Sequence, residues 1–553
     1  MLTLHHPIAL TPTVRPARRL RIAAALVAAS IGTLAGALVA PASGAAAMLT
    51  ARSAAAFRDS IGVQTHFGFA GYAYDTATTD ELASMLRTLG IRHLRDDLCL
   101  NTEQACVRVR GRLAAMQHAL GDGAPNVDLL AGYTRELASA PDRATRDSDI
   151  ERALAAATTA PLASMVAALE PVNEPDLKQT AGWESATLAD DDTFRRLLAE
   201  PRFAALRGVP QLSPAIGHAD NTAALLAAGW SGARADIGNF HPYPPAWGGP
   251  ENGLTVACGE DTVLGCARKL GGATEPIASE SGYTTAGTVL STSWVSERAQ
   301  SIYLPRLLLE NFRAGVARTY LYELIDLRPS RSAAVEGYGL WRSKSSGASI
   351  VPADPKPAAL AVSRMNATIG DLGTGGEAKA LDVTVAAGGH AVGDEVVRRV
   401  LLARADGSYV LALWQPQAVW SNAIFRQRDL TVSDLPIEVT IGGATWTASA
   451  TRPSLGDGPT GSWQRTQRLS LPVGADVTLV ELRADGSAPD GMTIDPAQAA
   501  GGAAATAGAN NATGSSATTG SAEATQQAWQ AVAKRGALAL VQARRSTAAR
   551  ADR

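Results

Sequence analysis

The sequence predicts an α/β protein in which a (β/α)8 TIM barrel is followed by a C-terminal all-β sandwich. First, short apolar runs alternate with amphipathic helical segments from about residue 61 to residue 369. Second, the pattern changes to a period of two from about Glu377, with Gly and Asp at the turns. Third, the competing fold, an open doubly wound sheet, carries a Gly-rich phosphate loop after its first strand. Residues 67–72, which follow the first apolar run, are rich in aromatic side chains and lack that motif.

The sequence contains eight apolar runs that we predict to be strands, which is the number of strands in a (β/α)8 barrel. They span residues 61–67, 91–95, 127–130, 166–172, 210–216, 237–241, 276–279 and 316–325. Apolar residues that recur on one face predict helices between the strands. These helices span residues 79–89, 103–120, 147–165, 192–206, 222–229, 294–314 and 355–369. We therefore assign residues 48–372 to the barrel.

The predicted sandwich occupies residues 373–485. Its strands are short and alternating, with Gly-containing turns between them, as in β-sandwich domains. They span residues 380–385, 395–403, 409–414, 437–441, 445–448, 466–471 and 476–482. Residues 486–553 are rich in Ala, Gly, Thr and Ser, a composition that does not bury a core, so we expect a disordered tail.

The first 47 residues are typical of an export signal. Four arginines, which include the pair Arg18-Arg19, precede the apolar stretch 22–40, and small residues at 41–47 offer cleavage sites. The alternative is an uncleaved membrane anchor, because the stretch is about long enough to span a bilayer. We expect cleavage, no stable membrane insertion afterwards, and a secreted or periplasmic protein.

Four cysteines fall in two close pairs, and in an exported protein this spacing predicts two disulfides. The pairs are Cys99–Cys106 and Cys258–Cys266. Four free thiols are the alternative. A metal site is a weaker alternative, since no Cys-x-x-Cys spacing occurs and no histidines flank the cysteines at ligand spacing.

The charges are nearly balanced, with 50 basic and 52 acidic residues. This balance gives no electrostatic footprint for nucleic acid. We expect a monomer without a nucleic-acid partner.

Polar side chains gather where the predicted strands end, which is where barrels of this kind place their active sites. Glu174 follows the fourth strand and Glu280 the seventh. Two carboxyl groups that face each other are what acid/base cleavage of a glycosidic bond needs. The other polar residues at these ends offer hydrogen-bonding groups and aromatic faces, which suit a polyhydroxylated ligand: His66, Arg95, Asn173, His241, Tyr243, Tyr322 and Glu323.

Three segments resemble the retaining glycoside hydrolases of clan A, in particular families 39 and 5. They are Val-Asn-Glu-Pro at 172–175, Phe-His-Pro-Tyr at 240–243 and Ser-Glu-Ser-Gly-Tyr at 279–283. The resemblance covers roughly residues 61–369 and the trailing β-domain.

The resemblance implies roles for the residues that match these segments. Glu174 would be the general acid/base and Glu280 the nucleophile of a double-displacement reaction, which needs no metal or organic cofactor. Asn173 would hold the sugar 2-hydroxyl, and His241 would lie near Glu174. Arg95 and Tyr243 would position Glu280. A nearby guanidinium and phenol are expected to lower the pKa of a nucleophilic carboxyl group.

Three other residues allow more than one interpretation. Glu170 lies deeper in the fourth strand than Glu174, and we expect a buried ion-pair partner without a catalytic role. His66 is either a substrate contact or a histidine packed in the barrel. Glu323 departs from the clan A pattern, which often has Trp near this point; it would bind a sugar hydroxyl or pair with Arg95.

These observations predict an exported retaining glycoside hydrolase that acts on an oligo- or polysaccharide with Glu174 and Glu280. Two alternatives use the same residues or fold: a carbohydrate-binding protein without catalysis, and a transglycosylase of exopolysaccharide assembly. The sandwich would buttress the barrel or serve as a carbohydrate-binding module.

Overall fold

The structure is a computed structural model, in which ten stretches of the chain are described. They are residues 47–99, 102–121, 125–133, 142–177, 181–246, 248–273, 275–288, 293–330, 333–370 and 380–485. All but the last residue of the predicted export segment, and the whole predicted tail, lie outside these stretches. Within them, no helix is both long and apolar enough to cross a membrane.

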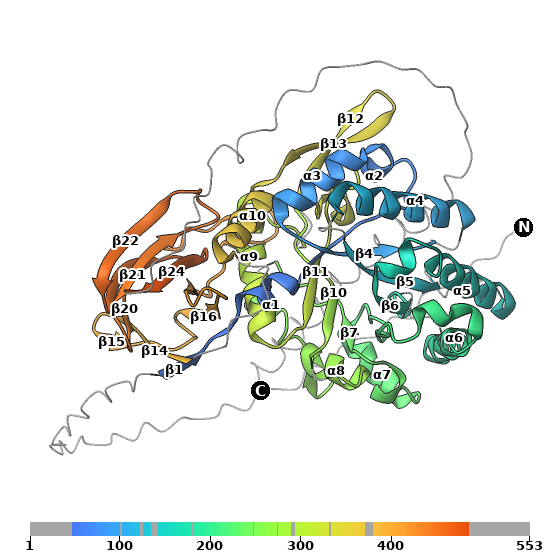
Figure 1. Ribbon diagram of the computed structural model, residues 1–553, viewed down its shortest axis with the longest axis horizontal. Helices are drawn as coiled ribbons and strands as arrows, with labels where there is room; N and C mark the ends of the chain where they lie inside the picture. Colours follow the sequence, from blue (N-terminus) through green and yellow to red (C-terminus); the bar gives the residue numbers. More distant parts are fainter. Residues whose placement is uncertain are drawn as a thin grey trace, which may run out of the picture. The chain divides into compact units, whose positions relative to one another are not determined.

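A seven-stranded parallel sheet forms the centre of the first part of the chain (Figure 1). Its strands run in the order β6-β5-β4-β3-β11-β10-β7, and every neighbouring pair is parallel. They are β3 Ile61–Gln64, β4 His93–Asp97, β5 Asn126–Tyr133, β6 Val166–Val172, β7 Asn239–Phe240, β10 Ile277–Ser281 and β11 Arg318–Leu321. Seven of the eight predicted strands are therefore present: β6 has the predicted bounds, and the ends of the other six differ from the prediction.

The predicted fifth strand takes a different form. Residues 211–215 make isolated parallel bridges rather than a continuous ladder. Leu169 and Asn173 bridge to this segment on one side, and the segment bridges to Ile237, just before β7, on the other. Pro210 and Pro214 carry no backbone N–H, so the segment cannot donate at those positions. It nevertheless links the two edge strands of the sheet, so that the carboxyl ends of β6 and β7 lie on one rim.

Helices follow most strands. They are α1 Ala54–Asp59, α2 Ala73–Thr76, α3 Thr79–Leu89, α4 Glu103–Leu120, α5 Arg143–Ala157, α6 Trp183–Leu198, α7 Thr222–Ala227, α8 Val263–Leu270, α9 Glu297–Arg313 and α10 Pro357–Ile369. Helix α3 shows why the sequence signals work. The Thr78 side chain and Glu81 form a capping box, and Gly90, with φ of 64°, ends the helix in a left-handed conformation.

Two helix predictions were wrong in their bounds. The helix predicted over 147–165 begins earlier, where Asp142 caps α5, and ends at Ala157, ahead of Pro161. The helix predicted over 192–206 is α6, which begins directly after Gly182 and stops at Leu198. Short 3₁₀ helices fill several connections: η3 Leu162–Ser164, η4 Pro201–Leu206, η5 Ala219–Asn221, η6 Gly232–Arg234, η7 Pro250–Asn252 and η8 Ala334–Gly337.

The second part of the chain forms two largely antiparallel sheets, one ordered β1-β14-β20-β23 with β15 on β14, the other β2-β16-β17-β24-β21-β22. The first contains β1 Ala47–Thr50, β14 Ala380–Ala387, β15 His390–Ala391, β20 Leu435–Ile441 and β23 Arg468–Val473. The second contains β2 Arg52–Ser53, β16 Arg398–Ala403, β17 Tyr409–Trp414, β21 Trp446–Thr451, β22 Pro459–Thr466 and β24 Thr478–Ala484. Residues of both sheets share one apolar core, including Val383 and Leu411.

Residues 47–53 depart from the sequence assignment, because each of the two sheets takes a strand from them. Strand β1 pairs with β14, and β2 pairs with β16. These residues were assigned to the barrel, or to the end of the signal segment, by position alone. Three hairpins complete the described strands: β8 Ala257–Cys258 with β9 Asp261–Thr262, β12 Trp341–Ser346 with β13 Ser349–Pro355, and β18 Trp420–Ser421 with β19 Arg428–Asp429.

Buried hydrogen bonds join η7 and α9, which belong to the first part of the chain, to residues 414–417 beside the antiparallel sheets. Trp414 Nε1 on β17 donates to Glu251 Oε1 at 2.7 Å, and Arg306 on α9 donates to the same carboxylate and to Gln417 O at 2.8 Å. Arg306 is fully buried. The two antiparallel sheets are thus packed against the rest of the described chain.

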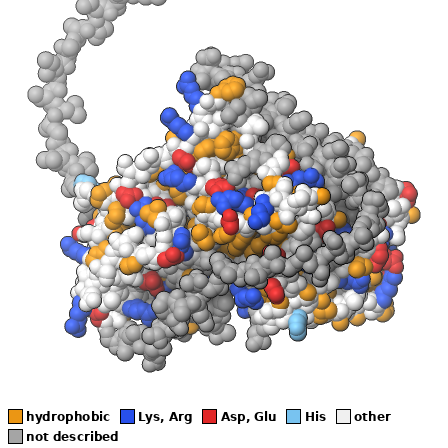
Figure 2. Space-filling view, turned by 90° about the horizontal axis from the view of Figure 1, so that it is seen from above, with side chains coloured by type: hydrophobic (Ala, Val, Ile, Leu, Met, Phe, Trp, Pro, Cys, Tyr) orange, Lys and Arg blue, Asp and Glu red, His pale blue; other side chains and the backbone are white. Residues whose placement is uncertain are grey.

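Both predicted disulfides are present, Cys99–Cys106 and Cys258–Cys266. On the face drawn in Figure 2, basic and acidic side chains are interspersed among the described residues.

Candidate active site

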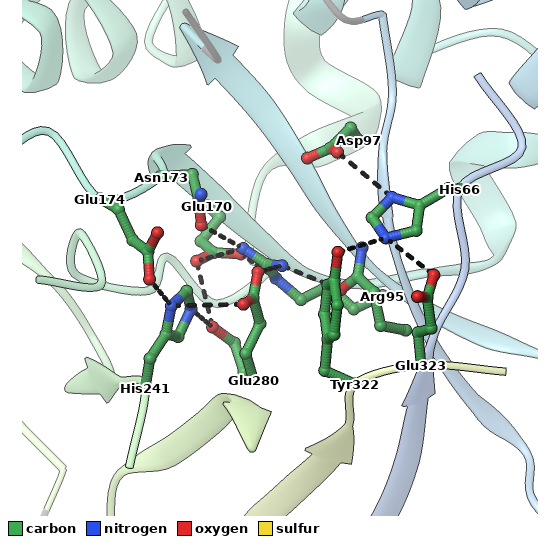
Figure 3. A network of polar contacts seen from close by, with 12 residues as sticks. His66, Arg95, Asp97, Glu170, Asn173, Glu174, His241, Glu280, Tyr322 and Glu323 are labelled. Carbon is green, nitrogen blue, oxygen red and sulfur yellow. Dashed lines mark hydrogen bonds and ion pairs between the residues drawn. The ribbon is translucent and has the colours of Figure 1, made fainter. Parts of the chain in front are cut away.

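Arg95 lies at the centre of a buried polar network at the carboxyl end of the parallel sheet (Figure 3). It points inward from β4 and is 1% exposed. An arginine has five N–H donors, and all five of them are used here. Nε and Nη2 donate to Glu170, Nη2 also to Asn173 Oδ1, and Nη1 to Gln64 Oε1 and to Glu280 Oε1.

Glu170, on β6, is held by donors on both carboxylate oxygens. Arg95 Nε reaches Oε2 at 2.7 Å, and Asn239 Nδ2 and Ser279 Oγ reach Oε1 at 2.5 and 3.2 Å. Its side chain is completely buried. A buried carboxylate that is fully hydrogen-bonded to an arginine is a structural anchor, which agrees with the ion-pair interpretation of Glu170.

Glu280 projects from β10 and takes donors on both oxygens as well. Arg95 Nη1 lies 2.6 Å from Oε1, and the Tyr243 hydroxyl donates to Oε2 at 2.7 Å. Burial raises the pKa of Glu280, while His241, Arg95 and the Tyr243 hydrogen bond act to lower it. The expected net lowering was therefore wrong, because burial outweighs the contacts. These contacts nevertheless favour the ionised form of Glu280 over that of a carboxyl group without them.

Glu174 follows β6 and turns out of the strand. Its φ is 42°, in the left-handed region that a non-glycine residue rarely adopts, and its backbone N–H donates to Ala215 O at 2.9 Å. Such backbone strain often accompanies function. The side chain is buried, and Oε2 has no hydrogen-bond partner among the described residues. Burial, with a smaller contribution from the nearby Asp176 carboxylate, raises the pKa of Glu174 to about 8.

His241 connects the two catalytic candidates. Its Nδ1 lies 2.7 Å from Glu174 Oε1 and 3.6 Å from Glu280 Oε2, and its Nε2 lies 3.0 Å from Ser279 Oγ. The Ser279 hydroxyl donates its proton to Glu170, so it accepts one from His241 Nε2–H. Burial lowers the pKa of His241, which favours the neutral ring with an unprotonated Nδ1. Glu174 then supplies the proton of the Glu174–His241 hydrogen bond, in agreement with its raised pKa.

The carboxyl groups of Glu174 and Glu280 are close neighbours. One oxygen from each and a His241 nitrogen lie within 4.8 Å of one another. These three groups also have the chemistry of a metal-binding set. The fully engaged Arg95 guanidinium, 2.6 Å from Glu280 Oε1, opposes the binding of a second cation there. The arrangement fits two carboxyl groups that share a substrate better than it fits a metal.

His66 and Glu323 lie together on the other side of Glu280. His66 Nε2 is 3.2 Å from the Tyr322 hydroxyl and 3.4 Å from Glu323 Oε2. Tyr74, on α2, donates to Glu323 Oε2 at 3.3 Å. The alternative pairing of Glu323 with Arg95 is not formed, since all five Arg95 donors have other acceptors. Burial raises the pKa of Glu323 and lowers that of His66.

The predicted residues are therefore brought to one rim of the sheet, but several of their partners were missed. These partners are Gln64, Tyr74, Asp97 and Ser279, together with Asp176, whose carboxylate acts on Glu174, and Asn239, which donates to Glu170. A signal existed for Gln64, Asn239 and Ser279, which are polar residues inside otherwise apolar strands, where burial requires a hydrogen-bond partner. Tyr74 and Asp176 lie outside the strands, where no periodicity could reveal them.

No protein-family model and no curated protein matches the sequence. Solved structures show distant likeness. A glycoside hydrolase family 17 beta-1,3-glucanosyltransferase from Rhizomucor miehei is 16% identical over 51% of this chain and 92% of its own, with a TM-score of 0.36. The Bacteroides uniformis beta-glucuronidase 2 is 12% identical over 76% of this chain and 43% of its own, with a TM-score of 0.38.

A family GH2 beta-galacturonidase from Eisenbergiella tayi, bound to galacturonate, is 14% identical over 56% of this chain and 51% of its own, with a TM-score of 0.40. This chain thus spans about half the length, or less, of the glucuronidase and the galacturonidase. At these TM-scores the likenesses carry no argument about activity, which has to come from the site.

Proposed function

We propose that the protein is an exported retaining glycoside hydrolase that cleaves a polysaccharide with Glu174 and Glu280. The observation that carries the proposal is the pair of buried carboxyl groups at one strand rim. One oxygen of each carboxyl group and a nitrogen of His241 all lie within 4.8 Å of one another. Retaining enzymes place the two carboxyl groups about 5–5.5 Å apart, and inverting enzymes about 6.5–9.5 Å. The short spacing supports retention.

The two carboxyl groups differ in the way that the reaction requires. Glu280 accepts hydrogen bonds from Arg95 and Tyr243, which stabilise its charge. Glu174 has a pKa of about 8 because of its burial, so it carries a proton at neutral pH. Two neighbouring carboxyl groups that differ in this way in their hydrogen-bond partners fit an acid paired with a nucleophile.

In the first step Glu280 attacks the anomeric carbon, the glycosidic C–O bond breaks, and Glu174 gives its proton to the departing oxygen. In the second step a water attacks the same carbon, Glu174 takes the water's proton, and the bond to Glu280 breaks. Asn173 accepts from Arg95 through Oδ1, which turns its Nδ2 donor away from Arg95. That donor is placed to hold the sugar 2-hydroxyl as positive charge develops on the ring.

The proposal also includes a fold assignment for the two parts of the chain. We interpret the curled parallel sheet, linked at its edges through residues 211–215, as a (β/α)8 barrel of clan A type that begins after β2. It is followed by a sandwich over 373–485 that also includes β1 and β2 from residues 47–53. The strand rim that carries Glu174 and Glu280 is then the carboxyl-terminal face of the barrel. Two disulfides fit an oxidising compartment outside the cytosol.

Substitution of the two glutamates tests the function. We expect Glu174→Ala to lower kcat/KM on the polysaccharide by about 10²–10⁴-fold, the usual contribution of a general acid, and Glu280→Ala to lower it at least as much. Glu103→Ala, on the exposed start of α4, is the matched control and keeps full activity. A glycan-panel digestion with reducing-end detection identifies the substrate and measures the loss.

A small anion gives the two variants different signatures. In Glu280→Ala, azide can enter the space left by the carboxylate and attack the anomeric carbon from that face, while Glu174 protonates the leaving oxygen. The product is a glycosyl azide of inverted configuration. In Glu174→Ala, the glycosyl–Glu280 intermediate still forms from an aryl glycoside with a good leaving group, and azide then gives retained configuration. Full activity of either variant on the polysaccharide would refute the proposal.

A further inference from the structure

A second group of polar side chains lies beside the proposed nucleophile, and the hydrolytic mechanism does not use it. We call His66, Asp97, Tyr322 and Glu323 the His66 group. His66 Nε2 contacts the Tyr322 hydroxyl at 3.2 Å and Glu323 Oε2 at 3.4 Å, and His66 Nδ1 lies 3.8 Å from Asp97 Oδ2. The members come from the ends of three adjacent strands, β3, β4 and β11.

The His66 group and Glu174 lie on opposite sides of Glu280 (Figure 3). Glu174 protonates the leaving oxygen, so under the proposed function the scissile bond lies on the Glu174 side. The sugar ring over Glu280 therefore turns its opposite edge toward Tyr322 and His66. The Tyr322 ring, next to Tyr243 at a centroid distance of 6.4 Å, separates the nucleophile from His66. The His66 group is thus placed to contact ring substituents remote from the reacting carbon.

Two buried polar atoms in this group lack hydrogen-bond partners among the described residues. They are His66 Nδ1 and Glu323 Oε1, on side chains that are 3% and 0% exposed. Buried polar atoms in proteins are nearly always paired, so unpaired ones need an explanation. His66 is held firmly, since it stacks on Phe69 at 4.4 Å between ring centroids. Sugar hydroxyl groups, which both donate and accept, could pair such atoms.

The charges around this end of the site oppose an acidic sugar. Glu280, Glu323 and Asp97 are all carboxyl groups, and Arg95 is the single Arg or Lys among the residues labelled in Figure 3. Every N–H donor of Arg95 already has an acceptor within the site. Lys356, behind Glu323, donates to Asp326, Thr285 and Gly337. A uronate carboxylate held there would be buried beside the carboxyl groups of Glu280, Glu323 and Asp97, while the donors of Arg95 and Lys356 already have acceptors, which is unfavourable.

We propose that the sugar unit held over Glu280 carries no acidic group, and that His66 and Glu323 select it by binding hydroxyl groups on the edge opposite the scissile bond. Asp97 and Tyr322 complete this subsite. The inference rests on the proposed function for the orientation of the ring. It extends that function by naming a class of excluded substrates, the uronides, and the residues that exclude them.

Equilibrium binding tests this selectivity without relying on turnover. The Glu174→Gln variant keeps the ligand intact, and calorimetry compares oligosaccharides that differ at C6 alone: cello-oligosaccharides with their C6-oxidised cellouronates, β-1,4-mannans with mannuronans, and galactans with galacturonans. We expect one neutral series to bind at least about 100-fold tighter than its uronate counterpart, the size of discrimination that buried polar groups provide. Equal or tighter binding of a uronate, or binding of neither series of any pair, would overturn the proposal.

Two isosteric variants test whether the His66 group is responsible. In the Glu174→Gln background, Asp97→Asn removes negative charge with little change in volume, so we expect it to reduce the neutral-to-uronate binding ratio about 10-fold or more. Glu323→Gln replaces a hydroxyl-binding carboxyl group whose charged form burial disfavours, so we expect a smaller reduction of the same ratio. Asp59→Asn is the control, because Asp59 lies before β3, at the other end of the strand that leads to His66, and is largely exposed. An unchanged ratio in both Glu323→Gln and Asp97→Asn would remove these residues from the selection.

The outcome also separates this inference from the proposed function. If the wild-type protein cleaves a uronide through Glu174 and Glu280, the function stands and the exclusion of acidic sugars is wrong. If the variant binds a neutral series selectively but the wild type cleaves nothing, the subsite stands and the hydrolytic function is wrong.

Discussion

Glu170 and Glu174 come from the same stretch of chain, four residues apart, and both are buried, yet their surroundings differ sharply. Glu170 lies inside β6 and receives donors on both oxygens, with the Arg95 guanidinium at 2.7 Å. Glu174 lies just past the strand end, contacts His241 through one oxygen, and has no described partner on the other. The completeness of hydrogen bonding, rather than burial, thus distinguishes Glu170 from Glu174, the proposed acid/base.

The difference has consequences for stability. Removal of one partner of a buried ion pair costs about 3–5 kcal/mol. Without Glu170, Arg95 would keep Glu280 as its remaining carboxylate partner among the described residues. The ionised form of Glu174, in contrast, destabilises the fold. Its pKa is raised from 4.5 in the unfolded chain to about 8 in the folded one, so its contribution to stability is present below pH 4.5 and is lost as the pH rises toward 8. Removal of its ionisable group should not harm the fold at neutral pH.

The largest effect expected from this comparison is therefore on folding, and it should differ between two matched substitutions. Glu170→Gln should lower the free energy of unfolding by about 3–5 kcal/mol at pH 7, because Arg95 loses its main charge partner. Glu174→Gln should leave it unchanged or raise it by about 1–3 kcal/mol, with the gain growing between pH 5 and pH 8. Denaturant unfolding, followed by tryptophan fluorescence, measures both.

Activity measurements on the Glu170→Gln and Glu174→Gln variants separate a catalytic role from a structural one. Glu174→Gln should fold normally and lose catalysis, so a loss of activity without a loss of stability identifies a chemical role. A Glu170→Gln variant as stable as the wild type would mean that the Glu170–Arg95 pair does not hold the site together, and the comparison would fail.

A smaller effect concerns the proton on Glu174. The activity of the wild type should fall as the pH rises through about 8, because the acid loses its proton, and should fall at low pH as Glu280 becomes protonated. In Ser279→Ala, His241 Nε2–H loses its acceptor. The ring can then carry its proton on Nδ1 and donate to the Glu174 carboxylate, which stabilises the ionised acid. We expect the alkaline limb of kcat/KM to move about 1 pH unit lower.

Ser281→Ala is the control for this shift. Ser281 lies on the same strand, is fully buried and donates to Pro242 O at 2.8 Å, so the substitution removes an equivalent hydroxyl without touching His241. If Ser279→Ala and Ser281→Ala give the same pH profile as the wild type, the proposed orientation of the His241 ring is wrong.

Much of the fold and of the candidate site could be predicted from the sequence, because periodicity reports local structure. Helix α4, over Glu103–Leu120, and strand β6, over Val166–Val172, have the predicted bounds. The strand ends then placed Asn173, Glu174, His241 and Glu280 on one rim. What periodicity does not contain is pairing between distant segments, so the strands β1 and β2, which join sheets more than 300 residues away in sequence, were not predicted.

The electrostatic character of the site was also beyond the sequence. The Arg95 and Tyr243 contacts with Glu280 suggested a lowered pKa, yet the depth of burial, which no motif records, reverses the direction. Whether Glu323 could pair with Arg95 depended on whether an Arg95 N–H donor remained without an acceptor. None does, because Gln64 and Asn173 lie where they accept two of the five donors. Sequence motifs identify the residues of the site, whereas three-dimensional packing decides which of their polar atoms have hydrogen-bond partners.

The central claim is that Glu174 and Glu280 act as a closely spaced acid/base and nucleophile. The most direct test is the anomeric configuration of the first product, read by proton NMR in the first minutes after wild-type protein meets its substrate, before mutarotation. The new reducing end should appear with the configuration of the bond that was cleaved, because two displacements occur at the same carbon. A product that first appears with inverted configuration would contradict the claim.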